Sequence, residues 1–149
     1  MINKSTETFD YIFIGMGAAN SLLLLEMDEK DLLRNKKIGI IEPSKKNVND
    51  RNFCFWSSEE EVLKLNLDDL ISSKWQQIKV SDRENQSISP IYYYHIRGID
   101  VYKKVKEKLK VHHAFYFHEV FNGEPLLNSK SFIIQLLNSK IIANKVFDS

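Results

Sequence analysis

A short apolar strand that runs directly into two glycines and then into a leucine-rich helix is the feature that most constrains this fold. The strand covers residues 9–14, Gly15 and Gly17 form the turn, and the helix begins at Ala18. A helix N-terminus offers unpaired N–H groups and about half a unit of positive dipole charge, which suits a diphosphate. Gly15 permits the tight turn, and Gly17 lets an anion approach the main chain where a Cβ would collide. The pattern predicts a nucleotide-binding turn made by Gly15, Gly17, Ala18, Ala19 and Asn20.

A second apolar strand supports this prediction. Residues 37–41 lead into the carboxylate of Glu42, which follows Asn20 by 22 positions. This spacing is close to the roughly 20 residues expected before the acid that binds ribose hydroxyls. Between the strands, Ala18 to Leu33 is long enough for about four helical turns, so the three elements form one βαβ unit. The simpler interpretations are an ordinary strand-to-helix turn and a solvated Glu42, and the joint spacing favours the nucleotide site.

Asn20 stands where the dinucleotide fingerprint has its third glycine. Two interpretations remain open at this stage. Either the helix packs less closely on its strand, or the amide of Asn20 points toward the ligand.

Composition excludes several function classes. The 149 residues suit one domain, and a net charge of +1 gives no electrostatic footprint for nucleic acid. The lysine-rich run over residues 103–110 is interpreted as the solvated face of a helix. The single Cys54 excludes an internal disulfide and, with a polar N-terminus from Met1 to Thr8, indicates the cytoplasm. No run approaches the ~18 apolar residues of a membrane span.

The rest of the chain predicts further strands and helices. After a loop at residues 43–50, Ser58 and the glutamates that follow predict a helix N-cap with an acidic first turn. Residues 75–80 and 87–95 predict two strands, Ile99 begins a helix, and residues 114–121 predict another strand. Residues 131–137 and 140–147 predict a hairpin that returns to the sheet. The expected fold is α/β: a Rossmann-like dinucleotide-binding βαβ with a parallel sheet, plus an antiparallel β-meander.

Other candidate chemistry is weak. His112, His113 and His118 lie on or beside a predicted strand, where neighbouring side chains point to opposite faces, and no metal site is expected. Cys54 has no histidine near it in sequence and is interpreted as a packed thiol.

Five segments of the chain carry a resemblance to a known family. They are FDYIFIGMGAAN from Phe9, IIE from Ile40, DRNFCFW from Asp50, IRGIDVY from Ile96 and KVFDS from Lys145. In this order they resemble the bacterial lycopene cyclase family. The glycine turn agrees with the family pattern G-x-G-x-x-N, in which Asn20 is the expected residue. The stretch Asp50 to Trp56 resembles D-R-T-W-x-F-W, with Asn52 and Phe53 in place of threonine and tryptophan.

The resemblance implies an FAD/NAD(P)-binding fold and a flavoprotein whose reaction is not a net oxidation. Lycopene cyclases close the linear ends of lycopene into β-ionone rings in carotenoid biosynthesis, with FAD in its reduced form and NAD(P)H as a candidate reductant. A reduced, anionic flavin would stabilise a developing cation beside it by electrostatic attraction. By matching position, Glu42 would bind the adenosine ribose, and Arg51 and Arg97 would lie near the flavin. The alternative for Arg97 is a helix-start residue that pairs with Asp100.

Members of this family are longer than 149 residues, so we expect an N-terminal portion of an FAD-binding domain, with the substrate domain and a second flavin segment absent. For this reason no catalytic residue is assigned. The apolar substrate implies peripheral membrane contact for the full enzyme. Two alternatives stay open: another FAD-dependent oxidoreductase or monooxygenase, and a truncated, non-catalytic dinucleotide-binding module.

Overall fold

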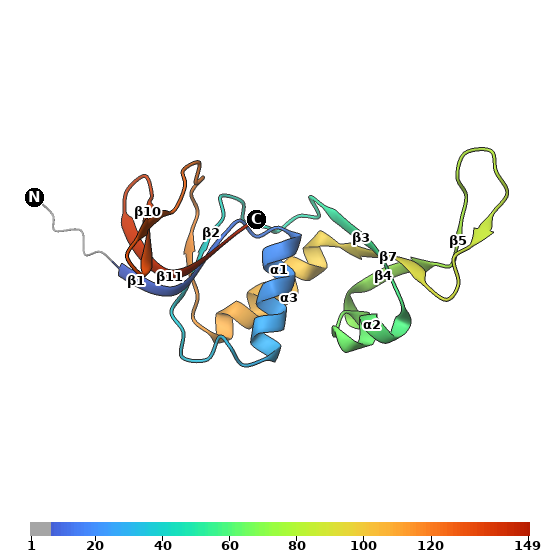
Figure 1. Ribbon diagram of the computed structural model, residues 1–149, viewed down its shortest axis with the longest axis horizontal. Coiled ribbons are helices and arrows are strands. Elements are labelled where there is room, and N and C mark those ends of the chain that lie inside the picture. Colours follow the sequence, from blue (N-terminus) through green and yellow to red (C-terminus); the bar gives the residue numbers. More distant parts are fainter. Residues whose placement is uncertain (1–6) are drawn as a thin grey trace, which may run out of the picture. The chain divides into compact units, whose positions relative to one another are not determined.

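The computed structural model describes residues 7–149, so most of the polar N-terminal stretch from Met1 to Thr8 lies outside the described residues. The chain divides into two compact units (Figure 1). The first unit combines the residues up to Lys46 with Lys104–Ser149, and the second is Asn47–Lys103.

The first unit is built on a six-stranded sheet in the order β8-β2-β1-β11-β10-β9. Strands β2 and β11 run parallel to β1, and β8 runs parallel to β2, whereas β9, β10 and β11 form an antiparallel meander. The predicted α/β fold with a parallel sheet and a meander is confirmed. The bounds are β1 (Glu7–Ile14), β2 (Ile38–Ile41), β8 (Phe115–Phe117), β9 (Leu126–Asn128), β10 (Ser131–Gln135) and β11 (Lys140–Asp148).

The hairpin prediction is confirmed as well, because β10 pairs with β11 and β11 returns beside β1. In register, Tyr11 lies opposite Lys145 and Ile14 lies opposite Asp148. Strand β2 is apolar on both faces, as a strand in a covered parallel sheet requires, and all four of its residues are buried. The sequence does not predict strand β9, since its three residues are exposed and too few to show a pattern.

Helix α1 (Ala18–Glu29) begins where the sequence predicts but ends four residues before Leu33. The chain leaves the helix at Lys30, and Asp31 adopts φ +57, a left-handed conformation that stops an α-helix. Helix α3 (Gly98–Val111) begins one residue before the predicted Ile99. Asp28 near the end of α1 binds Lys108 Nζ at 2.8 Å and His112 Nε2 at 2.7 Å, so the two elements are held together by charge.

The second unit contains a three-stranded antiparallel sheet in the order β3-β7-β4, and a two-stranded hairpin of β5 and β6. Ser58 caps α2, since its Oγ accepts a hydrogen bond from the Glu61 N–H, as predicted. The bounds are β3 (Asn52–Ser57), α2 (Glu59–Lys64), a 3₁₀ turn at Asp68–Leu70, β4 (Ile71–Trp75), β5 (Gln77–Ile78), β6 (Gln86–Ser87) and β7 (Tyr92–Arg97).

The two strands predicted at residues 75–80 and 87–95 are confirmed only in part: β5 lies within the first range, and β7 covers the second half of the second range. The observed β4 ends at Trp75, and the chain beyond it enters the small hairpin. Pro90 has no N–H to give to a ladder, so the run from Ser87 to His95 is broken and β7 begins only at Tyr92. The segment Asp50 to Trp56, for which the sequence predicts no strand, supplies β3.

One face of the three-stranded sheet carries a row of aromatic rings. Trp56 and Trp75 are both register partners of Tyr93, with ring centroids 4.7 and 6.1 Å from it. The two tryptophans remain 51% and 47% exposed. Such cross-strand pairs stabilise a sheet by roughly 0.2–1 kcal/mol each, which helps a sheet with so few strands.

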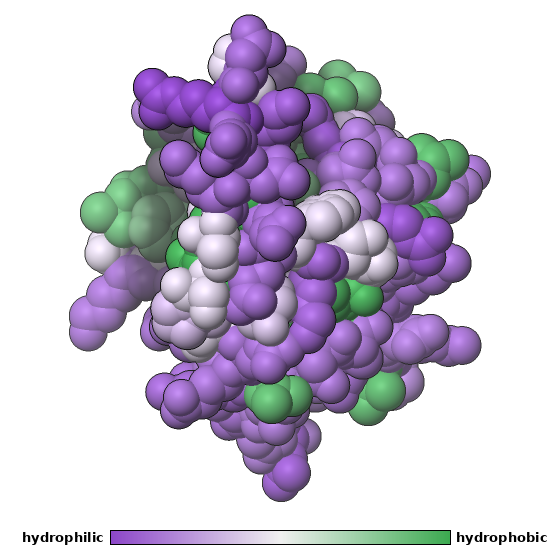
Figure 2. Space-filling model, turned by 90° about the vertical axis from the view of Figure 1, so that its right-hand side faces the viewer, coloured by the Kyte–Doolittle hydropathy of each residue, from purple (hydrophilic) through white to green (hydrophobic). Residues whose placement is uncertain are grey.

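Most of the face drawn in Figure 2 is hydrophilic, and hydrophobic residues appear on it as small separate groups. Of the helices in residues 7–149, none combines the length and the apolar character that a membrane span requires.

Candidate functional site

The strand order changes direction at β1, which has β2 on one side and β11 on the other. In open α/β sheets, ligands bind at such a switch point, beside the carboxyl ends of the strands. Strand β1 ends at Ile14 and passes directly into the glycine turn. The predicted site residues Gly15, Gly17, Ala18, Ala19 and Asn20 therefore lie where the topology favours a ligand.

Gly15 and Gly17 shape this turn. Gly15 has φ +82, and a Cβ there would come within 2.7 Å of the Ser149 carbonyl oxygen, so only glycine fits. Its N–H donates to the Ile41 carbonyl at 2.8 Å and fixes the turn to the end of β2. At Gly17 a Cβ would meet only the Ser149 Oγ, at 3.7 Å, and would otherwise project into open space.

The N-terminus of α1 is open to a ligand. Gly17 is the N-cap residue and provides no side-chain hydrogen bond, and the first turn carries no acidic residue. Ala18 and Ala19 follow, with side chains too small to cover the helix end. These features leave main-chain donors and a positive dipole end to an anion, so the turn fits the diphosphate of a dinucleotide.

Asn20 has a role that neither sequence interpretation foresaw. Its side chain is 3% exposed, and its amide nitrogen donates to the carbonyls of Ile14 and Gly15, both at 2.9 Å, and of Phe147 at 3.3 Å. The amide therefore joins the end of β1, the turn and the end of β11. Contact between Asn20 and a cofactor stays a prediction, but its N–H groups already bind the protein's main chain.

Glu42 lies at the end of β2 and faces the glycine turn. It is 8% exposed; Oε2 accepts the Met16 N–H at 2.8 Å and Oε1 accepts the Ser44 N–H at 2.9 Å. The solvated interpretation of Glu42 is therefore wrong. A carboxylate has about four lone-pair positions, so two remain for ribose hydroxyls.

A pocket of about 560 Å³ opens beside Glu42 and Met16. Its far wall comes from β8 and the residues around it, including Tyr116 and His118. The His118 Nδ1 lies 3.3 Å from the Glu42 carbonyl oxygen, and burial raises the pKa of Tyr116 above its ordinary value, which keeps its phenol neutral. These residues join the candidate site because β8 is the parallel neighbour of β2. In the sequence, the strand predicted at residues 114–121, directly after the helix that begins at Ile99, is the signal that could have indicated Tyr116 and His118.

Lysines from α3 also reach this pocket, contrary to the solvated-face interpretation of residues 103–110. Lys106 and Lys110 line it. Lys106 Nζ donates to the carbonyl of Lys46 at 3.0 Å and to the carbonyl of Lys45, and burial lowers the pKa of Lys106 below its ordinary value. The interpretation holds for Lys103, which is exposed.

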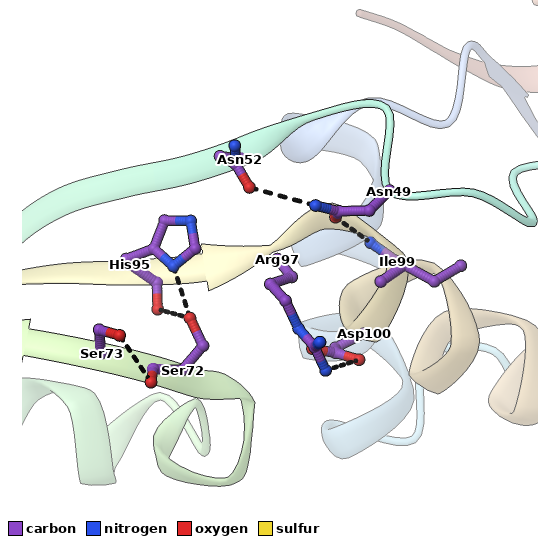
Figure 3. A network of polar contacts seen from close by, with 8 residues as sticks. All are labelled: Asn49, Asn52, Ser72, Ser73, His95, Arg97, Ile99 and Asp100. Carbon is purple, nitrogen blue, oxygen red and sulfur yellow. Dashed lines mark hydrogen bonds and ion pairs between the residues drawn. The ribbon is translucent and has the colours of Figure 1, made fainter.

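The two predicted arginines belong to the second unit. Arg51 is exposed and precedes β3; its carbonyl accepts the Gly98 N–H at 2.9 Å. Arg97 ends β7, opposite Asn52, so the two arginines come from adjoining positions on paired strands. The Arg97 guanidinium binds Asp100 through Nε at 2.7 Å and Nη2 at 3.1 Å, which confirms the alternative pairing (Figure 3). Their proximity to a flavin stays a prediction.

Figure 3 shows the polar contacts around this strand end. The Asn49 amide spans β3 and the start of α3, because it donates to the Asn52 Oδ1 at 3.3 Å and its oxygen accepts the Ile99 N–H at 3.2 Å. Farther along β7, Ser72 Oγ contacts His95 Nδ1 at 2.5 Å and donates to the His95 carbonyl at 2.9 Å. These contacts are exposed, and they tie the start of α3 and strand β4 to the neighbouring strands.

Solved enzyme structures share this fold at low sequence identity. The anhydrotetracycline hydroxylase OxyS from Streptomyces rimosus matches with a TM-score of 0.68 and 9% identity, over 95% of this chain and 31% of its own. NikD, an amino acid oxidase of nikkomycin biosynthesis, matches at 0.61 and 11% over 97% and 51%, and the halogenase PltM in complex with phloroglucinol and FAD at 0.60 and 12% over 95% and 34%. The chain thus spans about half of NikD and about a third of the other two.

A comparison with curated protein sequences finds no match. The family model "Lycopene cyclase protein" matches residues 10–149, which is nearly the whole chain. That range includes the glycine turn, Glu42, both arginines and the returning strand β11. The chain therefore belongs to the lycopene cyclase family.

Proposed function

We propose that this chain is the amino-terminal, FAD-binding portion of a lycopene β-cyclase-like flavoprotein. The observation that carries the proposal is the open N-terminus of α1 beside the buried Glu42, in a chain that matches the lycopene cyclase model over residues 10–149. A helix N-terminus supplies diphosphate binding, and the acid at the end of the second strand supplies ribose binding.

Each part of the cofactor has a proposed partner in this chain. The main chain of Gly15, Gly17, Ala18 and Ala19 binds the diphosphate, while Asn20 holds the turn that presents these donors. The Glu42 carboxylate accepts the ribose hydroxyls, and the pocket beside it takes the adenosine. Arg51 and Arg97 would lie on the flavin side. FAD in its reduced form, with NAD(P)H as its proposed reductant, supplies negative charge that stabilises a developing carbocation.

The substrate proposed for the whole protein is lycopene, whose ends are closed into β-ionone rings without net oxidation. The acid and base of this reaction are not assigned to any residue of this chain. An apolar polyene of this kind partitions into bilayers, so we propose a cytoplasmic protein that touches the inner membrane face.

The cofactor proposal is tested by titrating the purified chain with FAD and following flavin fluorescence. We expect saturable binding that Glu42→Gln weakens about tenfold or more, since a charged acceptor for hydroxyl groups is lost. Glu60→Gln, at an exposed position of α2, is the matched control and should bind like the wild type. Absence of FAD binding by the wild-type chain, or equal binding by both variants, would contradict the proposed site.

The reaction is tested separately by expressing the complete gene product in cells that accumulate lycopene. β-Carotene is the expected product. The matches to an oxidase, a halogenase and a hydroxylase favour a second candidate, a flavin enzyme that oxidises or oxygenates its substrate. Products that contain added oxygen would support that candidate. FAD binding with lycopene left unchanged would favour a non-catalytic dinucleotide-binding module.

A further inference from the structure

A continuous chain of hydrogen bonds connects the glycine turn to helix α3. It begins at the Met16 N–H, which donates to Glu42 Oε2 at 2.8 Å, and continues from Glu42 Oε1 to the Ser44 N–H at 2.9 Å. The Lys46 N–H then donates to Ser44 Oγ at 3.1 Å. Lys106 completes the chain by donating to the Lys45 and Lys46 carbonyls. The loop after β2 is therefore fixed at both ends, by Glu42 and by Lys106.

This loop needs an external anchor. Lys46 has φ +47, in the left-handed region, which is unfavourable for a residue with a Cβ. Two successive carbonyls bind one ammonium group, and hydrogen bonds from a charged donor are stronger than those between neutral groups. The Lys106 ammonium thus helps to stabilise the end of the loop in this conformation.

The same residues form one side of the nucleotide pocket. Met16, Glu42, Ser44, Lys45 and Lys106 all line the cavity of about 560 Å³. A shift of the loop would move the Ser44 N–H, which orients one oxygen of Glu42. The geometry of the ribose-binding carboxylate therefore depends on a lysine in a helix 64 positions later in the chain.

We propose that Lys106 is a positioning residue for the nucleotide, which holds the loop at residues 43–46 and, through it, the carboxylate of Glu42. This inference rests on the proposed function. Two of the three ammonium N–H groups of Lys106 bind main-chain carbonyls, so its effect on the nucleotide is transmitted by the loop.

The test measures the binding of FAD, ADP and adenosine to the full chain with Lys106→Met, Lys106→Arg and Lys103→Met. Lys106→Met keeps length and helix propensity but has no donor, and we expect all three ligands to bind about tenfold more weakly. Lys106→Arg can still donate to two carbonyls and should recover part of the loss. Lys103→Met changes an exposed lysine of the same helix and should bind like the wild type.

Two outcomes would overturn the proposal. Unchanged binding by Lys106→Met would show that the loop needs no anchor. A loss confined to FAD and ADP, with adenosine unaffected, would show that Lys106 contacts phosphate directly. A wild-type chain that binds none of the three ligands would instead contradict the proposed function. In that case, amide hydrogen exchange tests whether Lys106 anchors the loop.

That measurement needs no nucleotide and remains informative if Lys106→Met lowers stability. Amide hydrogen exchange of Ser44 and Lys46 in the ligand-free protein should accelerate at least about tenfold in Lys106→Met, relative to amides of β1, and recover in Lys106→Arg. Equal acceleration throughout the first unit would show only general destabilisation and would count against the proposal. A double variant with Glu42→Gln should bind no more weakly than Glu42→Gln alone, because both changes act on one carboxylate.

Discussion

The glycine turn of the first unit and the β3-β7-β4 sheet of the second carry residues for which flavin contacts are predicted, yet they hold their side chains differently. At the turn, Asn20 and Glu42 are buried and bind main-chain groups distant in sequence. In the sheet, Arg97 is exposed and pairs with Asp100, three positions later. A buried, satisfied network keeps its geometry without a ligand, whereas an exposed ion pair exchanges partners at little cost.

This difference indicates which residues form a preformed site. The turn is rigid because the protein itself needs its polar contacts, so a cofactor would meet donors already in place. Arg97 would have to leave a solvated pair before it contacts a ligand. We therefore expect substitutions at the turn to affect folding and binding together, and substitutions in the sheet to affect binding alone or neither.

The largest effect is expected for Gly15→Ala. The residue must keep φ +82, which costs about 1–2 kcal/mol with a side chain, and its Cβ would lie 2.7 Å from a carbonyl oxygen. We expect the free energy of unfolding in urea to fall by about 2 kcal/mol or more, and FAD binding to be lost. The control is Gly123→Ala, where the nearest atoms lie at 3.4 Å on the Phe121 ring. Equal stability and binding for the two variants would refute the role of the turn.

Asn20→Ala should have the next largest effect. It removes the amide that serves the carbonyls of Ile14, Gly15 and Phe147, and we expect a loss of about 1–3 kcal/mol in unfolding free energy. Asn20→Asp should be worse than Asn20→Ala at neutral pH, because a carboxylate would face three carbonyl oxygens. Chemical denaturation of the three proteins gives the order. If Asn20→Asp is the more stable variant, the Asn20 amide does not stabilise the fold by donating to these three carbonyls.

The distance along the chain between a residue and its partners decides the order of these effects. The same distance decides which contacts can be predicted from the sequence. The glycine turn is predictable because one strand, two glycines and a helix start are local features. The hydrogen bond from the Asn20 amide to the Phe147 carbonyl cannot be predicted in this way, since Phe147 is 127 positions away. The pattern around Lys106 indicates a solvated lysine because its carbonyl partners are 60 or more positions earlier.

The strands of the second unit are less predictable for a related reason. Their sequences are rich in tyrosine and serine and carry little apolar alternation, and Pro90 divides one run that otherwise suggests a continuous strand. The βαβ unit has strong periodicity and a covered sheet, and its prediction agrees with the structure to within a few residues. A strand that packs on both faces has a clear apolar pattern in its sequence. A strand in a half-exposed sheet has a weaker apolar pattern.

Acid should weaken the first unit through Asp28. Burial would raise the pKa of Asp28, but the hydrogen bonds from Lys108 and His112 outweigh it and lower the pKa below its ordinary value. The stabilisation is therefore present above the unfolded pKa of about 3.9 and is lost as pH falls through the lower folded value. We expect Asp28→Asn to be less stable than the wild type at pH 7, with the difference shrinking as the pH falls below about 3.9.

The control for this pH dependence is Glu59→Gln in the second unit, which breaks the exposed Glu59–Lys74 pair. Its stability should follow the wild type over the same pH range, because exposed pairs contribute little. A stability difference between Asp28→Asn and the wild type that grows as the pH falls would have the opposite sign and would contradict the pairing.

The smallest effect on stability is expected for Arg97→Met and Asp100→Asn. Each breaks the same exposed ion pair, so each should change the unfolding free energy by less than about 1 kcal/mol. Binding separates them. If Arg97 contacts the flavin, Arg97→Met weakens FAD binding while leaving ADP binding unchanged, and Asp100→Asn strengthens FAD binding slightly because it frees the guanidinium. Arg83→Met, an exposed arginine of the same unit, is the matched control in both titrations. Identical FAD affinity in all three variants would leave Arg97 with the ion pair alone.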